Sequence, residues 1–365
     1  MKIGFNSDEA LVRSVFFTKI FYIFFAEFVY SHLTRLGDTP KYLSSSIEFS
    51  PHVFLSSTGL MKTTGGVFGM LPSPIYHLPL CLLSFYGVFY LYKKLVECGL
   101  INTRKDRVYY YLLFSLPSVG VWTSIHSKES VGIFFSSICS VFICKLIFSN
   151  RLRYSFFDWM LLITSLYLMI IFKPQYVIAF FNISVFLICR KVFGARVLLF
   201  ILICAVIIQV VLLDYLQPII DWYAIQMYAH FDSDIAQSTR ENIFLTEGDF
   251  YRNIIPGIFI AFIGPTVNES IASPIKFMAF LESCFIVLIL SPVLMIHFKK
   301  MIILRINVLY LSIAVLFVFW ILFMHYPFGI FNPGSAIRYR NNFMPFFVAS
   351  LFVIKNFRFV ERLVR

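Results

Sequence analysis

The amino-acid sequence predicts an all-α fold, a polytopic transmembrane helical bundle of about ten spans, and three observations lead to this prediction. Apolar residues make up 59% of the chain and charged residues only 14%, whereas a soluble domain is roughly half apolar and a quarter charged. The apolar residues gather in runs long enough to cross a bilayer. Lys and Arg residues concentrate in alternate connecting segments, as they do in cytoplasmic loops.

A span needs about 17–25 predominantly apolar residues, and ten runs reach or approach that length. They lie near 14–33, 75–92, 108–125, 130–149, 157–173, 175–190, 197–213, 274–296, 306–324 and 343–356. With the N-terminus inside, most Lys and Arg residues fall in the predicted cytoplasmic connectors, among them Lys93, Lys94 and Arg104. Because basic residues favour the cytoplasmic side, we expect both chain ends to be cytoplasmic.

No stretch has the balanced composition of a soluble domain, so we expect a single integral membrane domain over 1–365. Residues 34–74 and 214–273 are expected to form two long outer loops, and 325–342 a shorter outer segment. Within the second loop, residues 253–267 are apolar but include two Pro and two Gly. We expect a re-entrant or interfacial segment there, which is tolerated only where protein or water covers its backbone.

Asp38 follows the first span, in the sequence Arg-Leu-Gly-Asp-Thr-Pro-Lys-Tyr. A carboxylate beside the membrane face is suited to act as a general base toward an incoming hydroxyl. The alternative is that Asp38 only begins a turn, since Gly-Asp-Thr-Pro is also favourable turn chemistry.

A tight polar turn, His126-Ser-Lys128-Glu129, is held between two apolar runs. At a membrane surface its two charges must pair, contact water or meet a charged ligand, and the Lys128 ammonium suits a phosphate. The alternative is a solvated hairpin between two helices.

The third polar segment leads from a Gly- and Pro-rich stretch to Arg338-Tyr339-Arg340, at the entry to the last predicted span. The guanidinium group of arginine can donate two hydrogen bonds to phosphate oxygens. Arginine near hydrocarbon is costly unless it forms an ion pair or is hydrated. Tyr339 suits the level of the lipid head groups. The alternative ligands are ordinary lipid head groups.

Several function classes find no support in the sequence. The net charge of +12 reflects the basic connectors, so we expect no nucleic-acid partner. There is no Walker loop, no GxGxxG and no His/Cys metal signature. Asp232-Ser-Asp234 spells the DxD of nucleotide-sugar enzymes, but the pattern is short and common, and we interpret it as part of a solvated loop. We therefore expect no cofactor, and a divalent metal has no supporting pattern.

The Asp after the first span, the Lys-Glu turn and the Asn332-Pro-Gly-Ser…Arg-Tyr-Arg segment resemble those of bacterial O-antigen polymerases of the Wzy type. These are related to the GT-C class of membrane glycosyltransferases. The motif resemblance covers about 40 residues, and the richness in Phe, Ile and Tyr is similar along the whole chain. Many GT-C enzymes have a paired acidic motif in the first loop, whereas Asp38 stands alone.

The resemblance implies a GT-C-like bundle in the bacterial inner membrane that builds the polysaccharide of lipopolysaccharide on the periplasmic face. It implies transfer of glycan from undecaprenyl diphosphate to a lipid-linked repeat unit, with membrane lipids and a chain-length regulator as further partners. Asp38 would be the acceptor-activating base, and Lys128 and Glu129 would shape the same catalytic pocket. Arg338, Arg340 and Tyr339 would bind the departing diphosphate.

Two alternative functions stay open. A GT-C transferase adding a single sugar from a polyprenyl phosphate needs a similar cationic site. A flippase for lipid-linked oligosaccharides would need charged residues lining an intramembrane cavity and an internal repeat. Glu27 lies well inside a predicted span, but no internal repeat is visible.

Overall fold

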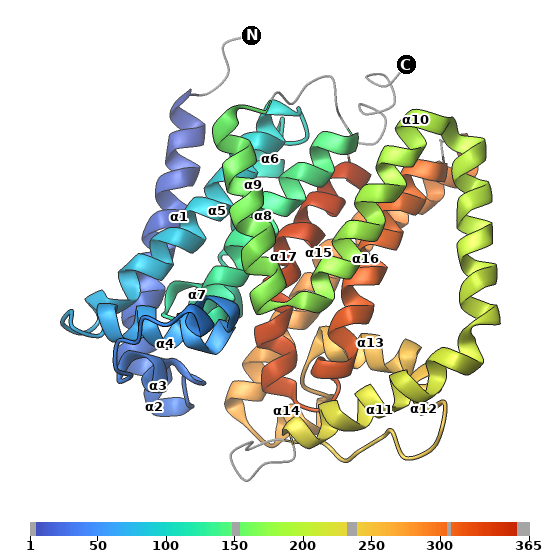
Figure 1. Cartoon of the computed structure of the whole chain (residues 1–365). Coiled ribbons are helices and arrows are strands. Elements are labelled where there is room, and N and C mark those ends of the chain that lie inside the picture. The colour runs from blue at the N-terminus through green and yellow to red at the C-terminus, as the bar shows by residue number, and fades with distance from the viewer. Residues whose placement is uncertain (1–4, 148–153, 232–238, 305–307, 356–365) are drawn as a thin grey trace. The chain divides into compact units, whose positions relative to one another are not determined.

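The computed structural model describes residues 5–147, 154–231, 239–304 and 308–355 (Figure 1). Within these ranges the chain is helical with connecting turns and contains no strand, which confirms the all-α prediction. Contacts divide the chain into two compact units where the sequence predicted a single domain. Unit 1 comprises Met1–Val177 and Asn341–Arg365, and unit 2 comprises Ile178–Arg340.

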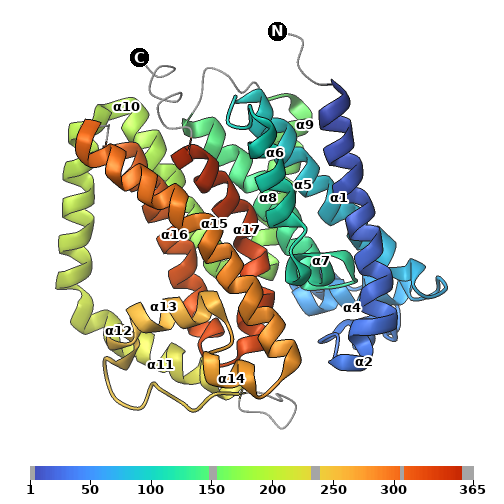
Figure 2. The same cartoon turned by 180° about the vertical axis from the view of Figure 1, so that it is seen from behind.

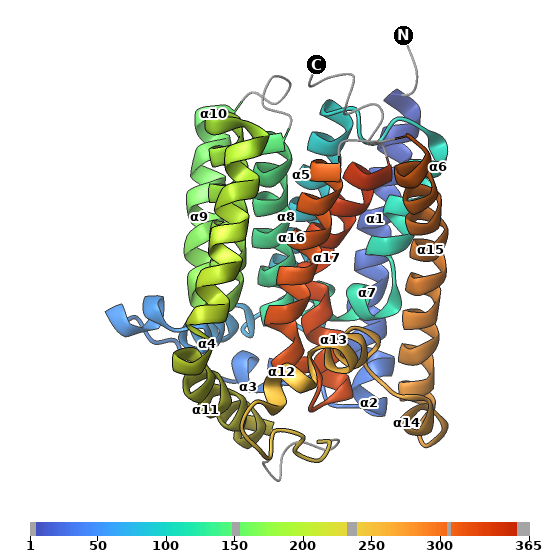
Figure 3. The ribbon, with the colours of Figure 1, turned by 90° about the vertical axis from the view of Figure 1, so that its right-hand side faces the viewer.

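Unit 1 contains the helices of the first half of the chain and the end of the last helix. They are α1 (Phe5–Phe25), the π-helical η1 (Ala26–Tyr30), α2 (Ser31–Leu33), α3 (Thr39–Leu43), the 3-10 helix η2 (Pro51–Leu55), α4 (Ser57–Phe68), the 3-10 helix η3 (Ile75–His77), α5 (Leu78–Glu97), α6 (Arg104–Phe114), α7 (Pro117–Ser124), α8 (Lys128–Ile147), α9 (Phe156–Phe172) and the C-terminal part of α17 (Pro333–Lys355). Helix α8 packs against both α5 and α9 (Figure 3). Gly87 permits the approach to α8, since a Cβ there would lie 2.8 Å from the Phe134 Cα.

Unit 2 contains most of α10 (Pro174–Val211) and the helices that follow. They are α11 (Leu213–Phe231), α12 (Asp249–Arg252), α13 (Ile254–Ile263), α14 (Val267–Ile271), α15 (Pro274–Leu304), α16 (Val308–Gly329) and the start of α17. Figure 1 shows that the ribbon of α10 turns back sharply and has two arms. This one helix therefore covers the two predicted runs 175–190 and 197–213.

Four helical segments of the described chain are long and apolar enough to cross a membrane: Ile75–Glu97, Lys128–Ile147, Ile254–Ile271 and Pro274–Ser291. Helix α1 and the following η1 add a stripe of exposed aromatic side chains at helical spacing, formed by Phe17, Phe21, Phe24 and Phe28. Proteins in water rarely expose apolar patches of this kind, whereas lipid solvates them. Both observations indicate association with a membrane.

The predicted span 108–125 is interrupted. Helix α6 ends at Phe114, and α7 begins at Pro117 after a break at Ser115 and Leu116. Proline has no N–H and its ring clashes with the preceding turn, so it is tolerated in the first turn of a new helix but not inside a longer one. The 108–125 run is therefore two short helices in place of the single helix that we predicted.

Helix α13 ends abruptly inside an apolar stretch. Gly264 has a φ of +85°, which closes the helix and separates α13 from α14. Figure 2 shows α13 as a short helix lying across the lower parts of α15 and α16. The candidate span Ile254–Ile271 is thus divided into two helices, within the segment for which we predicted a re-entrant or interfacial path.

Three side chains from other elements donate hydrogen bonds to the backbone carbonyls at the end of α13. Arg340 Nη1 donates to the Phe262 carbonyl at 3.0 Å. Ser283 Oγ donates to the Ile263 carbonyl at 2.6 Å, and Arg240 Nη2 to the Gly264 carbonyl at 2.5 Å. A helix end away from water needs such partners, because an unsatisfied carbonyl there costs several kcal/mol. This arrangement is what a broken helix in an apolar region requires.

In unit 1, an ion pair between Lys355 and Asp106 joins α17 to α6. Asp106 also forms a capping box with Thr103 at the start of α6, and only 2% of the residue is exposed. Burial alone would raise the pKa of the Asp106 carboxyl. The hydrogen bonds from Lys355 and Thr103 outweigh burial and hold this pKa below its ordinary value.

The lowered pKa of Asp106 predicts an acid-sensitive contribution to stability. The contribution is fully present above the unfolded-state pKa of about 4 and is lost as the pH falls through the lower folded-state pKa. We expect Asp106→Asn to unfold at a lower temperature than the parent at pH 7, and the difference to narrow steadily below about pH 4. Thermal unfolding in detergent across this range checks it, with Glu9→Gln at the exposed Glu9–Arg13 pair as the control. A difference that does not change with pH would contradict the assignment.

Candidate functional site

Polar side chains of unit 1 meet where the first predicted outer loop, the start of α5 and the turn before α8 come together. We call Glu27, Thr39, Ser73, Tyr76, His77 and His126 the polar cluster. None of its members is a predicted site residue, but Asp38 is adjacent to Thr39 in the sequence and Lys128 follows His126 by two residues.

The turn that carries His126 is rigid because its hydroxyl groups are all engaged. Ser127 Oγ accepts from the Ser130 N–H at 3.2 Å, which caps the first turn of α8. Ser127 Oγ also donates to the Trp122 carbonyl at 2.5 Å, and Ser130 Oγ donates to the Ile125 carbonyl at 2.6 Å. These bonds satisfy the carbonyls at the end of α7, so α7 and α8 are joined by a fixed corner.

His126 is fully buried, and its backbone and ring link three segments. Its carbonyl accepts from Thr39 Oγ1 at 2.9 Å, and its N–H donates to His77 Nδ1 at 3.1 Å. Its ring Nε2 lies 3.1 Å from the Met61 carbonyl. Because a carbonyl only accepts, Nε2 must carry the proton.

The other ring nitrogen of His126, Nδ1, is buried and has no hydrogen-bond partner among the residues that the structure describes. Burial lowers the pKa of the His126 imidazole, although the bond to the Met61 carbonyl opposes this. The ring is therefore neutral at pH 7 and holds Nδ1 as an acceptor inside the cluster.

Glu27 is the acidic centre of the polar cluster. It lies in η1, and π-helical turns within α-helices are frequent at functional sites. Its carboxylate accepts from Ser73 Oγ at 2.8 Å, from the Tyr76 hydroxyl and from His77 Nε2 at 3.3 Å. His77 Nδ1 accepts from the His126 backbone, so His77 is the Nε2–H tautomer that donates to Glu27.

Asp38 is joined to this network through its neighbours. Gly37 adopts a φ of +60° immediately before it, and α3 starts immediately after it. The Asp38 carboxylate accepts from the Tyr42 hydroxyl at 3.3 Å and lies 3.9 Å from Lys41 Nζ. The Tyr42 ring in turn packs edge-on against the His126 ring, with 6.3 Å between ring centroids. The side chain of Asp38 is 54% exposed, so a substrate can reach it.

Lys128 and Glu129 form the first turn of α8, whereas we had placed them in a turn between helices. Lys128 is half-buried, and its Nζ donates to Thr58 Oγ1 in α4 at 2.9 Å. Glu129 is 1% exposed. Acidic residues in a first turn are stabilised by the helix dipole, and a buried carboxylate cannot meet a substrate directly. The predicted catalytic role of Glu129 therefore does not fit its position.

Arg338 and Arg340, which we predicted to hold one diphosphate together, have different surroundings in the structure. Both lie inside α17, where residues two apart do not share a face. Arg340 is fully buried and bonded to Glu282 Oε1 at 2.6 Å, Ser283 Oγ at 2.7 Å and the Phe262 carbonyl at 3.0 Å. Tyr339 packs edge-on against Phe328. These three residues belong to unit 2, whereas Asp38 and Lys128 belong to unit 1.

Sequence reasoning missed Glu27, Tyr76, His77 and His126 as partners. Glu27 could have indicated them, because a carboxylate within an apolar run is costly unless a polar group from another helix pairs with it. The predicted DxD residues, Asp232 and Asp234, lie outside the described residues. Within the described ranges, no group of three or more His, Cys, Asp or Glu side chains could hold a metal ion.

No protein-family model matches this chain, and comparisons with curated proteins and with solved structures find no match. The chemistry of the site must therefore be interpreted from its own geometry. Asp38 and Glu27 are carboxylates within reach of a ligand, and Lys128 supplies a cation on the same side of unit 1. His77 and His126 are buried and hold these segments in place. Such a set can accept a proton from a hydroxyl and neutralise an anionic leaving group.

Proposed function

We propose that this chain is a polysaccharide polymerase of the bacterial inner membrane, with about ten spans and both termini in the cytoplasm. It transfers glycan from undecaprenyl diphosphate to a lipid-linked repeat unit on the periplasmic face. The observation that carries the proposal is the network joining Asp38, the polar cluster and the Lys128 turn at one end of unit 1. An exposed carboxylate and a lysine near the starts of two candidate spans support the proposal.

In the proposed reaction, an acceptor hydroxyl attacks the anomeric carbon of the donor glycan. Its proton passes to the Asp38 carboxylate as the new carbon–oxygen bond forms. The bond between the anomeric carbon and the diphosphate oxygen breaks, and undecaprenyl diphosphate leaves with the electron pair. Lys128 neutralises this leaving group. The donor arrives already activated, so the reaction consumes no nucleotide.

The deciding experiment is deletion of the gene followed by gel analysis of lipopolysaccharide. Loss of a polymerase should leave lipid A-core carrying a single repeat unit, and the full-length chain supplied in trans should restore the ladder. A strain that keeps its ladder after deletion would overturn the proposal. A GT-C transferase that adds one sugar would instead shorten or remove the repeat unit itself.

A second candidate function is transport of lipid-linked oligosaccharides, and a specific observation favours it. Lys19 is 1% exposed within α1, and its ammonium donates to Ser84 Oγ at 3.0 Å and Thr123 Oγ1 at 2.6 Å. Buried charges in apolar helices often mark transport pathways. For a transporter, the same deletion should remove the repeat unit from the cell surface completely, so the two outcomes are distinct.

A further inference from the structure

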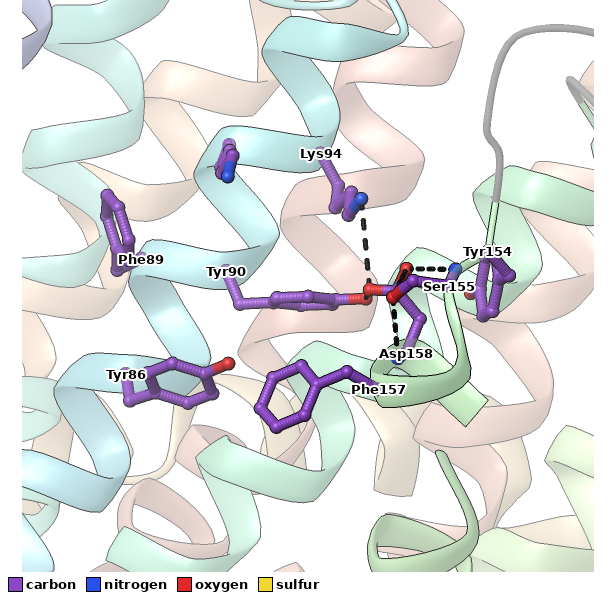
Figure 4. Close-up of a pocket in the computed structure, with 9 residues that line it drawn as sticks. Tyr86, Phe89, Tyr90, Lys94, Tyr154, Ser155, Phe157 and Asp158 are labelled. Carbon is purple, nitrogen blue, oxygen red and sulfur yellow. Dashed lines mark hydrogen bonds and ion pairs between the residues drawn. The ribbon is translucent and has the colours of Figure 1, made fainter. Parts of the chain in front are cut away.

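A cavity of about 570 Å³ lies between α5 and the start of α9 in unit 1, apart from the polar cluster (Figure 4). The polar cluster includes Tyr76 and His77 at the start of the candidate span Ile75–Glu97, whereas the cavity is lined by Lys93 and Lys94 near its end. At 1.5 Å per residue, His77 is about 14 Å of helix from Tyr86 and about 25 Å from Lys94. The cavity therefore belongs to the opposite half of this span.

The walls of the cavity are mainly aromatic. Tyr86, Phe89 and Tyr90 come from one face of α5, because residues three and four apart in a helix lie together. Tyr154 and Phe157 face them from the start of α9 (Figure 4). Aromatic side chains of this kind gather where a helix leaves the hydrocarbon, with an apolar body and a polar tip.

The one carboxylate in the lining is already engaged. Asp158 accepts from the Tyr90 hydroxyl at 2.5 Å and from Ser155 N–H and Oγ at 2.8 and 2.9 Å, as the third residue of α9 in a capping box. Lys94 Nζ lies 3.8 Å from Asp158 (Figure 4). It also lies 3.0 Å from Glu97. Asp158 is thus held in the wall, and Lys94 is shared between two carboxylates.

Lys93 lines the same cavity and is exposed. It sits one turn beyond Phe89 on the same helical face, so it adds positive charge above the aromatic wall. Lysine is an effective point-charge ligand for phosphate, and basic residues just beyond a membrane span attract anionic lipids. The cavity combines a cation for a phosphate with an apolar wall for the chain attached to it.

We propose that this cavity binds the phosphate head group of an anionic membrane lipid. Lys93 contacts the phosphate, and the aromatic face of Tyr86 and Phe89 packs along the first carbons of the acyl chains. A free phosphate ion would use the cation but gain nothing from the aromatic wall. A zwitterionic lipid would also pack its acyl chains against the aromatic wall, but its positively charged head group would be repelled by Lys93.

The test is native mass spectrometry of the full-length protein in detergent, titrated with dioleoyl phosphatidylglycerol, dioleoyl phosphatidylcholine or inorganic phosphate. We expect retention of phosphatidylglycerol in preference to phosphatidylcholine, and Lys93→Gln to weaken retention of phosphatidylglycerol about fivefold. Tyr86→Ala should weaken retention of both lipids. Lys105→Gln, the same change at an exposed lysine on α6, should leave retention unchanged.

Equal retention by the parent and Lys93→Gln would overturn the proposal, as would an equal loss in Lys105→Gln. Displacement of the lipid by millimolar inorganic phosphate would also overturn it and would assign the site to a free anion. Lys93 is exposed, so the variant can be confirmed as folded by its elution from a sizing column. The measurement needs no glycan transfer, so its result is independent of the proposed polymerase activity.

Discussion

Asp38→Asn is expected to lower the rate of repeat-unit transfer by about 10²- to 10⁴-fold while leaving the protein folded, since positioned general bases contribute effects of this size. The substitution removes the proton acceptor but little else. The side chain of Asp38 is 54% exposed, and its nearest partners are the Tyr42 hydroxyl at 3.3 Å and Lys41 at 3.9 Å. An amide oxygen can still accept from Tyr42. The measurement is the lipopolysaccharide ladder of a deletion strain carrying the variant, at expression equal to that of the parent.

A matched control for Asp38 lies in the same predicted outer loop. Glu48 is exposed and accepts a hydrogen bond from Ser50 Oγ at 3.2 Å, away from the polar cluster. Glu48→Gln makes the same chemical change and should restore a full ladder. A full ladder from Asp38→Asn would remove Asp38 from the proposed mechanism and leave Glu27 as the reachable carboxylate of the site.

Arg340→Met is expected to destabilise the protein by about 3–5 kcal/mol, the usual cost of breaking a buried ion pair by removing one partner. Glu282, with a side chain 4% exposed, would lose the guanidinium that now lies 2.6 Å away. The Phe262 carbonyl would lose its donor as well. The measurement is the unfolding midpoint in detergent, followed by sizing chromatography after heating.

Two further variants distinguish the loss of the buried ion pair from the loss of an arginine side chain as the cause of the destabilisation. In the double variant Arg340→Met, Glu282→Met, neither charge of this pair remains, so most of the lost stability should return. Arg252→Met removes an arginine whose side chain is 71% exposed and which pairs with Asp249 at 3.4 Å. It should cost at most about 1 kcal/mol, as exposed pairs do. If the double variant is as unstable as the single one, the ion pair is not what holds this region.

A stable double variant also decides whether Arg340 has a role in binding diphosphate. If it restores the polysaccharide ladder, Arg340 acts only in holding the end of α13. If it is stable but inactive, the predicted contact with diphosphate regains its support. The structure favours the first outcome, because within the described residues Arg340 donates hydrogen bonds to Glu282, Ser283 and the Phe262 carbonyl.

The helices were largely predictable from the sequence because apolar runs and their polar breaks are local features. The run 75–92 became η3 and α5, and 130–149 became α8, with boundaries displaced by a few residues. The run 108–125 is not one continuous helix, because Pro117 begins a new helix, a feature that hydropathy alone ignores. The four segments that qualify as candidate spans support a membrane-associated chain, and the count of ten stays a prediction.

The site was less predictable, because it depends on which distant residues meet. Asp38 and Lys128 were selected for being charged beside apolar runs, and the bond from Thr39 to the His126 carbonyl does bring their two segments together. The partnership of Glu27 with His77 joins residues 50 apart, and no local pattern encodes it. Arg338 and Arg340 were paired because they are close in the sequence, but helical geometry turns them to different faces.

The covered end of α13 has a consequence for how the protein is made. Arg340 bonds to a carbonyl 78 residues earlier in the chain, and Ser283 to one 20 residues earlier. During synthesis, α13 and α15 therefore leave the ribosome long before α17 can supply the arginine. Until Arg340 has been made, the Phe262 carbonyl lacks this donor and Glu282 lacks its cation. The native end of α13 can therefore be completed only once synthesis has reached α17.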